Sequence, residues 1–205
     1  MSISLHGSGR SRSFRALWAL EELRLDFTYV PIDFRAGDAR SPAYLKLNPG
    51  SKVPTLVDDG RALTESGAIL AWLGDRYGDG ALVPRAGTWA RACYDRWSYF
   101  AVTELEQPLW SIGKHRFALP RDWRVPAMLE TAPKEFARAT ALLSEGLGEQ
   151  PWILGETFTF ADVLLIHTLE WAKRFEVPAA EANLDAYRLR GLARPGYQRA
   201  LARLG

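Results

Sequence analysis

The most informative segment of this chain is Asn48-Pro49-Gly50-Ser51-Lys52-Val53-Pro54-Thr55-Leu56. A proline just before a strand cannot donate to the hydrogen-bond ladder of a sheet. If the Val53–Pro54 peptide bond is cis, Val53 can turn its N–H and C=O outward, where an extended peptide can pair with both as an added strand does. An ordinary trans proline at a strand start is the alternative, and the order of the surrounding elements makes us expect the cis bond.

The elements before this stretch alternate between strand and helix. Residues 3–5 predict a short strand, and apolar residues from Phe14 to Leu23 recur at helical spacing. Residues 26–34 alternate as a second strand does, and residues 41–47 predict a short helix before the Asn48-Pro49 break. A strand, a helix and a strand of this length imply a parallel pair with a right-handed crossover.

The elements after the stretch complete a first domain. Residues 55–57 and 61–64 predict a hairpin across Asp58-Asp59-Gly60, because Asp-Gly supplies the positive φ angles that a tight turn needs. A helix is expected over residues 66–77. The order β-α-β-α-β-β-α is that of a thioredoxin-like α/β domain over residues 1–77.

A glycine-rich segment, residues 78–87, is the predicted linker, and residues 88–205 predict an all-helical second domain. We expect the first long helix, residues 88–114, to be bent or interrupted at Pro108. The other expected helices span residues 133–147, 160–175, 183–190 and 195–204.

Composition limits the possible classes of function. The 205 residues are 47% hydrophobic and 24% charged with a net charge of +2, which is ordinary for a soluble protein and gives a nucleic-acid or membrane partner no support. The single cysteine, Cys93, excludes an intramolecular disulfide, fits a reducing cytoplasmic location and is expected to pack inside a helix. His6, His115 and His167 lack metal-ligand spacing, so no metal site is expected.

Two polar segments point to ligand chemistry. Glu65-Ser66 opens a helix, where unpaired N–H groups favour an anion, Ser66 can face a carboxylate and Glu65 can accept from an ammonium group. A plain helix cap is the alternative. The loop 8–15 holds serines and three arginines at another helix start, a setting that lowers the pKa of a thiol. Simple capping by these serines is the alternative there, and the glycine pattern of a phosphate-binding loop is missing.

A third segment is structural. Thr159 and Asp162 have the spacing of a capping box, with Phe158 placed to pack against Val163 as a hydrophobic staple. We expect this segment to start a buried helix.

Four segments together resemble the cytosolic glutathione transferase family, in particular bacterial-type members with a serine active site, over essentially the full length of the chain. They are residues 11–23, 48–56, 64–69 and 159–162. The resemblance implies a homodimeric cytoplasmic detoxification enzyme that transfers alkyl or aryl groups, with glutathione as co-substrate and no prosthetic group. It places glutathione on the main chain of Val53 beside Lys52 and Pro54, and on Glu65 and Ser66.

The resemblance also suggests which group activates the thiol. In serine-type members the hydroxyl lies about four residues before the arginine of the first helix, and counting back from Arg15 gives Ser11. Ser8, Ser13 or Arg10 are the alternatives, because this position shifts among classes. No tyrosine stands in the loop, and Cys93 lies elsewhere.

The second substrate is implied to be a small hydrophobic electrophile in an apolar site between the domains. Tyr99, Thr103 and Trp110 on the first long helix are our candidates for lining it. A non-catalytic glutathione-binding or protein-interaction module is one alternative function. A glutathione-dependent lyase, isomerase or peroxidase is another.

Two positions depart from the pattern of similar chains. Arg24 stands where a glycine commonly ends the first helix, so that helix is expected to end differently. The loop usually reads Asn-Pro-x-Gly-Lys, whereas here Gly50 comes one position early and Ser51 precedes Lys52.

Overall fold

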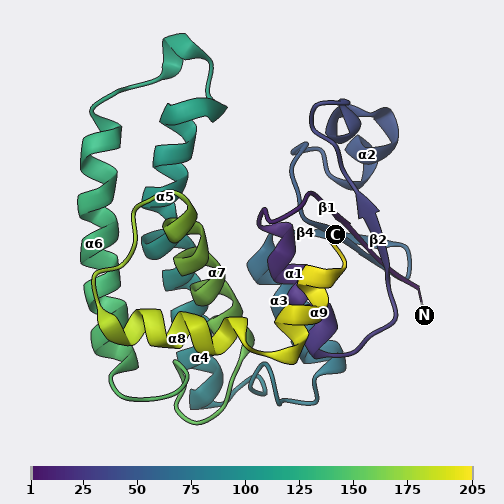
Figure 1. The fold of residues 1–205 in the computed structure, drawn as a ribbon. Coiled ribbons are helices and arrows are strands. Elements are labelled where there is room, and N and C mark those ends of the chain that lie inside the picture. Colours follow the sequence, from purple (N-terminus) through teal and green to yellow (C-terminus); the bar gives the residue numbers. More distant parts are fainter. Residues whose placement is uncertain (1, 205) are drawn as a thin grey trace. The chain divides into compact units, whose positions relative to one another are not determined.

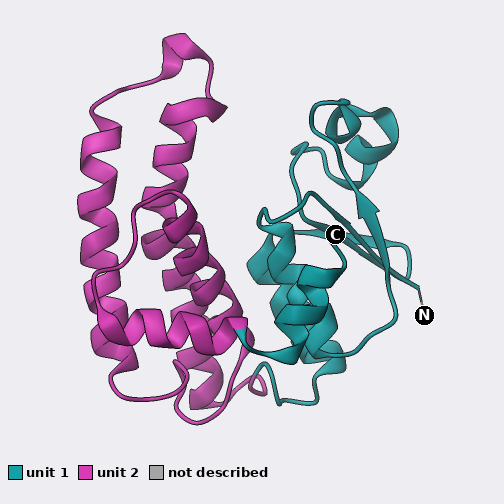
Figure 2. Ribbon diagram, viewed as in Figure 1, with its two compact units in different colours: residues 1–83, 193–205 teal, residues 84–192 magenta. Residues whose placement is uncertain are grey.

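A computed structural model describes residues 2–204, and their contacts divide the chain into two compact units (Figure 2). The first unit contains the residues up to Val83 together with those from Ala193 onward. The second unit runs from Pro84 to Leu192.

The first unit is built on a four-stranded mixed sheet, which confirms the expected thioredoxin-like order (Figure 1). The strands lie in the order β2-β1-β3-β4; β1 is parallel to β2 and antiparallel to β3, which is antiparallel to β4. Helices α1 and α3 pack on each other and on the sheet, while α2 lies apart from them. The elements are β1 Ile3–Gly7, α1 Ser13–Glu22, β2 Thr28–Pro31, α2 Pro42–Leu47, β3 Thr55–Asp58, β4 Arg61–Thr64 and α3 Ser66–Tyr77, with a 3-10 turn at Asp38–Arg40.

The β3–β4 hairpin forms as expected from its turn residues. Asp59 and Gly60 have φ angles of 47° and 79°, both in the left-handed region. Asp58 and Arg61 pair directly across the turn. A two-residue turn with two positive φ angles matches the twist of the flanking strands, which explains why Asp-Gly stands here.

Helix α1 ends in the way that a glycine would end it, although Arg24 occupies the position. Arg24 has a φ of 52°, and the N–H groups of Arg24 and Leu25 donate to the carbonyls of Glu21 and Leu20. This is the Schellman arrangement, in which a left-handed residue lets the chain satisfy the last carbonyls of the helix. The expectation of a different ending is therefore wrong for the backbone.

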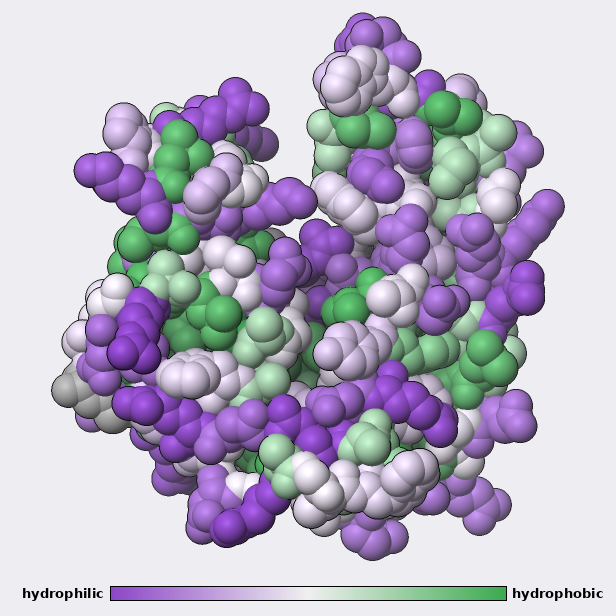
Figure 3. All heavy atoms as spheres, turned by 180° about the vertical axis from the view of Figure 1, so that it is seen from behind, coloured by the Kyte–Doolittle hydropathy of each residue, from purple (hydrophilic) through white to green (hydrophobic). Residues whose placement is uncertain are grey.

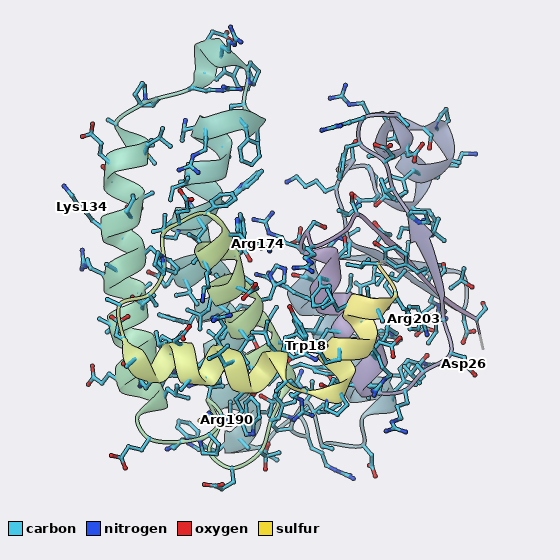
Figure 4. All side chains as sticks on the ribbon, viewed as in Figure 1. Trp18, Asp26, Lys134, Arg174, Arg190 and Arg203 are labelled. Carbon is cyan, nitrogen blue, oxygen red and sulfur yellow. The ribbon has the colours of Figure 1, made fainter. Side chains whose placement is uncertain are left out.

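The C-terminal helix α9, Pro195–Ala202, belongs to the first unit and packs along α1. The ring of Tyr197 lies 5.0 Å from both Phe14 and Trp18, centroid to centroid. Figure 4 labels Trp18 on α1 and Arg203 just beyond α9. Because these contacts join segments about 180 residues apart, the sequence-based division, which placed residues 88–205 in one domain, differs from the contact-based one.

The buried carboxylate of Glu21 strengthens this α1–α9 contact. Arg199 and Arg203 both donate to Glu21, and Arg194 donates to both carboxylate oxygens of Glu22 at 2.8 and 2.9 Å. Because Glu21 and Glu22 are largely buried, removing one of their arginine partners would leave an uncompensated charge and destabilise the contact.

The second unit is helical throughout its regular structure, as expected. The first long helical run contains two π-helical turns, Ala101–Leu105 and Lys114–Ala118. Pro108, which cannot donate a backbone hydrogen bond, follows the first of these turns inside α5, so the run continues rather than stops at the proline. The helices are α4 Trp89–Phe100, α5 Glu106–Gly113, α6 Met128–Leu147, α7 Phe160–Arg174 and α8 Ala182–Leu192, with a 3-10 turn at Arg121–Trp123.

Helix α6 begins at Met128, so the predicted start at Pro133 is wrong. Pro133 is the sixth residue of this helix, where a proline removes one backbone hydrogen bond, and the helix nevertheless continues to Leu147. By contrast, the capping box at the start of α7 is confirmed. The Asp162 carboxylate accepts from the Thr159 N–H at 2.7 Å, while the Thr159 side chain accepts from the third residue of the helix.

No helix among residues 2–204 is long and apolar enough to cross a membrane. On the face drawn in Figure 3, hydrophilic residues surround small groups of hydrophobic ones.

Candidate active site

Three chain segments leave the sheet of the first unit at the same end. Thr55, the first residue of β3, pairs with His6 of β1 on one side and with Thr64 of β4 on the other. The loop that follows β1, the loop that precedes β3 and the start of α3 therefore emerge together. These segments contain the serine loop, Val53-Pro54 and Glu65-Ser66, so the sheet register brings the predicted glutathione-binding segments to one place.

Two buried side chains, Asn48 and Tyr44, form hydrogen bonds that fix the loop before β3. The amide of Asn48 donates to the Lys52 carbonyl at 2.8 Å and to the Thr55 hydroxyl at 3.0 Å. The Tyr44 hydroxyl donates to the same Lys52 carbonyl at 2.6 Å and lies 2.9 Å from the Thr55 hydroxyl. Four side-chain contacts on two anchor points fix the path of the chain into Val53.

The structure confirms the predicted conformation of the peptide bond after Val53. The Val53–Pro54 bond is cis, and the Val53 side chain packs on a small core of Ile32, Ala39 and Tyr44. Across residues 2–204, neither the N–H nor the C=O of Val53 has a hydrogen-bond partner. An extended ligand pairs with a protein strand through backbone N–H and C=O groups. Because both groups of Val53 are available, its main chain is able to bind such a ligand.

The same loop shows how Ser51 replaces the usual glycine. Ser51 has a φ of 53°, the left-handed conformation that favours glycine, and its hydroxyl donates to the Ala39 carbonyl at 2.8 Å. Gly50 does not have a positive φ angle. The left-handed residue of this loop is therefore Ser51, although the glycine stands one position earlier.

At the start of α3, Ser66 is joined to the first helix by a buried arginine. The guanidinium of Arg15 is fully buried and its Nη1 donates to the Ser66 Oγ at 3.3 Å. Glu65, which precedes the helix, is exposed and has a φ of 67°. Positive charge from Arg15 and the unpaired N–H groups of the helix start favour an anion at this point.

The serine loop before α1 contains one buried hydroxyl and one at its surface. Ser13 is fully buried, and its Oγ accepts from the Ser8 N–H at 3.2 Å and from the Ser11 hydroxyl at 3.0 Å. The Ser11 Oγ in turn accepts from the Ser13 N–H at 3.2 Å, and Ser11 is half-buried. Ser8 is also half-buried and Arg10 is exposed, so of the predicted candidates only Ser13 is closed off from a ligand.

A tyrosine from β2 supports this loop from inside. A Cβ on Gly7 would lie 2.7 Å from the Cβ of Ser13 and 3.0 Å from the hydroxyl of Tyr29, so only glycine fits there. Burial raises the pKa of Tyr29, while the N–H of Gly9 acts in the opposite direction. The phenol remains neutral and serves as packing beneath the loop.

The three candidates for the electrophile site lie on one helical run. Tyr99 is 69% exposed, Thr103 donates to the Tyr99 carbonyl at 3.0 Å, and Trp110 is half-buried. The π-helical turn Ala101–Leu105 lies within this run. An extra residue in a turn rotates the following helix by about 100°, so a face inferred from regular spacing does not continue through it.

The remaining polar candidates have structural surroundings. Cys93 is half-buried within α4, and His115 accepts a hydrogen bond from the Val125 N–H at 3.1 Å. His167 is buried in α7. Residues 2–204 contain no group of His, Cys, Asp and Glu side chains that could hold a metal ion.

Arg15, Tyr44 and Asn48 position the site, and the sequence did not predict this role for any of the three. The available signal was weak, because a buried arginine is rare and its partner Ser66 lies 51 residues away. Asn48 was recognisable only as a turn residue.

Comparison with known proteins agrees with this geometry. Residues 10–76 match the model of the glutathione S-transferase N-terminal domain, and residues 92–202 match that of the C-terminal domain. The chain belongs to the cytosolic glutathione S-transferase family. It is 30% identical over 185 residues to the glutathione S-transferase GST-4.5 of Xanthomonas campestris, covering 88% of this chain and 91% of that protein.

Two further relatives show the range of the family. The disulfide-bond oxidoreductase YfcG of Escherichia coli is 30% identical over 151 residues, which is 70% of this chain and 68% of YfcG. The theta class glutathione S-transferase of Xanthomonas axonopodis pv. citri, solved with glutathione bound, superposes with a TM-score of 0.82 at 29% identity. That alignment covers 98% of this chain and 97% of the other.

Proposed function

We propose that this protein is a glutathione transferase that binds glutathione on the first unit and activates its thiol for attack on a small hydrophobic electrophile. The observation that carries the proposal is the convergence of three segments at one end of the sheet. Val53 offers an unpaired main chain there, and the buried Arg15 holds Ser66 at the start of α3.

Each part of glutathione has a complementary group in this arrangement. The cysteinyl main chain pairs with the N–H and C=O of Val53 as an added strand does. The γ-glutamyl carboxylate takes the Ser66 hydroxyl and the N–H groups of the α3 start, with the positive charge of Arg15 behind them. The ammonium group of the same residue is bound by the exposed Glu65. Lys52 and Pro54 flank the peptide.

Ser11 is the hydroxyl that we assign to the thiol. Ser13 is fully buried and its oxygen already accepts from two donors, whereas Ser11 reaches the surface at the same helix start. A hydroxyl and a helix terminus both stabilise a thiolate. Lowering the thiol pKa by about 2 units corresponds to roughly 2.7 kcal/mol, which one charge-assisted hydrogen bond and a helix terminus together supply.

The reaction is then a displacement or an addition by the thiolate. The thiol proton passes to solvent, the sulfur forms a bond to the electrophilic carbon, and in a displacement the leaving group departs with its bonding electrons. We place this chemistry in the cytoplasm, where a chain with a single cysteine is stable, and in a homodimer of the kind usual for the family.

Calorimetric titration with glutathione, together with conjugation to an activated aryl halide, tests the proposal. Saturable binding with turnover is expected. Ser66→Ala should weaken binding about tenfold or more, as expected when a hydrogen bond to a charged group worth roughly 1.5–3 kcal/mol is lost. Ser11→Ala should leave binding nearly unchanged and raise the pKa of bound glutathione, followed by the ultraviolet absorption of the thiolate.

Ser4→Ala is the matched control, because Ser4 is a half-buried serine inside β1, away from the loop. Absence of glutathione binding by the wild-type protein would refute the proposal. An unchanged thiol pKa in Ser11→Ala would refute only the assignment of Ser11.

A second candidate function is glutathione-dependent reduction of disulfides, which the similarity to YfcG favours. Two glutathione thiols would give two electrons to the disulfide and become glutathione disulfide, so Cys93 is not required. Turnover of a small disulfide but not of the aryl halide would select this function.

A further inference from the structure

The connection between α5 and α6 exposes three large apolar side chains. Residues 114–127 form the end of the α5–α6 hairpin in the second unit, and we call them the hairpin tip (Figure 1). Within the hairpin tip, the exposed fractions are 65% for Trp123, 58% for Phe117 and 50% for Val125. Large apolar side chains that are exposed together indicate an interaction surface, whereas a single exposed one needs no explanation.

Hydrogen bonds fix the conformation of the hairpin tip. The guanidinium of Arg124 donates to three backbone carbonyls within residues 116–119, at 2.9, 3.1 and 2.9 Å. The Val125 N–H donates to Nδ1 of His115 at 3.1 Å. These bonds join the two sides of the connection, so its apolar side chains are held near one another. A surface that is ordered in advance loses less conformational entropy when it binds.

The hairpin tip is also strongly basic. Its four basic residues are opposed within the tip by Asp122 alone, which gives residues 114–127 a net charge of +3. The next acidic residue, Glu130, lies beyond the tip in the first turn of α6. Because the whole chain has a net charge of only +2, its overall composition conceals this local excess. The basic residues of the tip are Lys114, Arg116, Arg121 and Arg124.

An anionic lipid surface complements both properties of the hairpin tip. Tryptophan is enriched where proteins meet the membrane–water interface, and the negative potential of anionic lipids attracts nearby Lys and Arg side chains. A second copy of this chain is a poor partner, because two tips of charge +3 repel each other. An acidic protein would match the charge, but the exposed rings at the end of a hairpin project outward and form no pocket for the anchor residues of a protein partner.

We propose that the hairpin tip binds reversibly to the surface of membranes that contain anionic lipids. The rings of Trp123 and Phe117 enter the interfacial region, and the exposed Arg116 and Arg121 contact lipid phosphates. The protein then lies on the membrane and does not span it. Binding of this kind requires neither glutathione nor turnover, so the inference is independent of the transferase function proposed above.

Flotation of the intact chain with vesicles, without glutathione, tests the inference. One set of vesicles is neutral phosphatidylcholine, and the other contains about 30% phosphatidylglycerol, which gives the surface a negative potential. At about 0.05 M salt we expect binding to the anionic vesicles to be about tenfold tighter or more than binding to the neutral ones. Most of this difference should be lost at about 0.5 M salt, because salt screens the attraction.

A pair of charge variants tests the role of the basic residues. Each basic residue near an anionic surface contributes roughly a factor of five, equivalent to about 1 kcal/mol. The double variant Arg116→Gln/Arg121→Gln should therefore weaken binding to the anionic vesicles about 25-fold. The matched control is Arg61→Gln/Arg138→Gln, which removes two exposed charges from β4 and from the middle of α6. The control should change the affinity by less than about twofold, because those charges lie outside the tip.

A pair of tryptophan variants tests the role of the rings. Trp123→Ala should weaken binding to the anionic vesicles about tenfold, because less apolar surface is removed from water. The matched control is Trp89→Ala, which removes a ring that is 83% exposed at the start of α4 and should leave binding nearly unchanged. Because all of these side chains are exposed, each variant should keep the thermal unfolding midpoint of the wild type.

Absence of vesicle binding by the wild-type protein, or equal binding to neutral and anionic vesicles, would overturn the inference. Equal losses in the tip variants and in their matched controls would overturn it as well. Tighter binding to polyglutamate than to anionic vesicles would do the same, since it would indicate an acidic protein as the partner. None of these results bears on the transferase function, which the glutathione titration tests separately.

Discussion

Replacing Asp162 with alanine should strongly destabilise the protein. Asp162 is fully buried at the beginning of α7. Its Oδ1 accepts from the Ile153 N–H at 2.9 Å and from the Tyr187 hydroxyl at 2.6 Å, while Oδ2 accepts from the Thr159 N–H at 2.7 Å and its hydroxyl at 3.0 Å. One carboxylate thus joins a loop, a helix start and α8.

The magnitude follows from the donors that the alanine variant would leave behind. The N–H groups of Ile153 and Thr159 and the hydroxyl of Tyr187 would lose their acceptor in a buried region. A buried donor without a partner costs about 1–3 kcal/mol, and loss of a cap costs about 1 kcal/mol. Allowing for relaxation of the Tyr187 hydroxyl, we expect a loss of about 4 kcal/mol in the free energy of unfolding.

Urea unfolding at pH 7 and fixed protein concentration, followed by far-ultraviolet circular dichroism, measures this loss. Tyr187→Phe removes a single donor and should cost about 1 kcal/mol. In the double variant Asp162→Ala/Tyr187→Phe the two costs should not add, because the phenylalanine removes one of the stranded donors. A loss below about 2 kcal/mol for Asp162→Ala, or additive costs, would refute the account of a shared buried acceptor.

The same residue gives a dependence on pH. Burial is the main cause that raises the pKa of Asp162 above its ordinary value of 3.8, and the hydrogen bonds it accepts from Ile153, Tyr187 and Thr159 act in the opposite direction. Above pH 3.8 the folded state therefore retains a proton that the unfolded state has released. The contribution of this group to stability is present at lower pH and declines as pH rises through the raised pKa. In Asp162→Ala this decline should be missing from the stability curve.

Further predictions concern backbone conformation and helix packing. Arg24→Gly should raise the free energy of unfolding by about 0.5–1 kcal/mol, because glycine takes the left-handed conformation without a steric penalty. Ser51→Gly should change it by less than about 0.5 kcal/mol, since the same relief is offset by the lost hydroxyl hydrogen bond. Gly146→Ala should cost about 1–3 kcal/mol because its Cβ would lie 2.3 Å from the Trp97 ring. Gly113→Ala, whose contacts are ordinary ones, should instead stabilise the helix by about 1 kcal/mol. Thermal unfolding measures all four, and a stabilised Gly146→Ala or a destabilised Arg24→Gly would contradict them.

The first unit was largely predictable because its signals are local. The Asp59-Gly60 turn and the strand pattern around it each require neighbours only a few residues away. The cis bond at Val53–Pro54 was predicted from the order of the elements, and the structure contains both that order and the cis bond. The capping box of Thr159 and Asp162 was equally local, and the spacing alone identified it.

The remaining features depend on contacts between distant segments. Assigning α9 to the first unit requires knowing that Glu21 meets Arg199 and Arg203, which no spacing rule reveals. Helix α6 begins at Met128, although Pro133 removes one of its backbone hydrogen bonds. Its start could not be predicted because the sequence does not show that the helix continues through the proline. The π-helical turns likewise arise from packing, because periodicity assumes that the number of residues per turn stays constant.

The two departures from the family pattern show which kind of interaction controls the backbone. A left-handed non-glycine residue costs about 1–2 kcal/mol, and both Arg24 and Ser51 adopt that conformation although the glycine is missing or displaced. Local preference would have moved the turn onto Gly50 or extended α1 beyond Arg24. The chain instead keeps the position of each turn, so the packing of Val53 on its small core and of α9 on α1 outweighs the local cost. The site geometry is therefore a property of the packed unit, and substitutions in its loops should alter stability before they alter the path of the main chain.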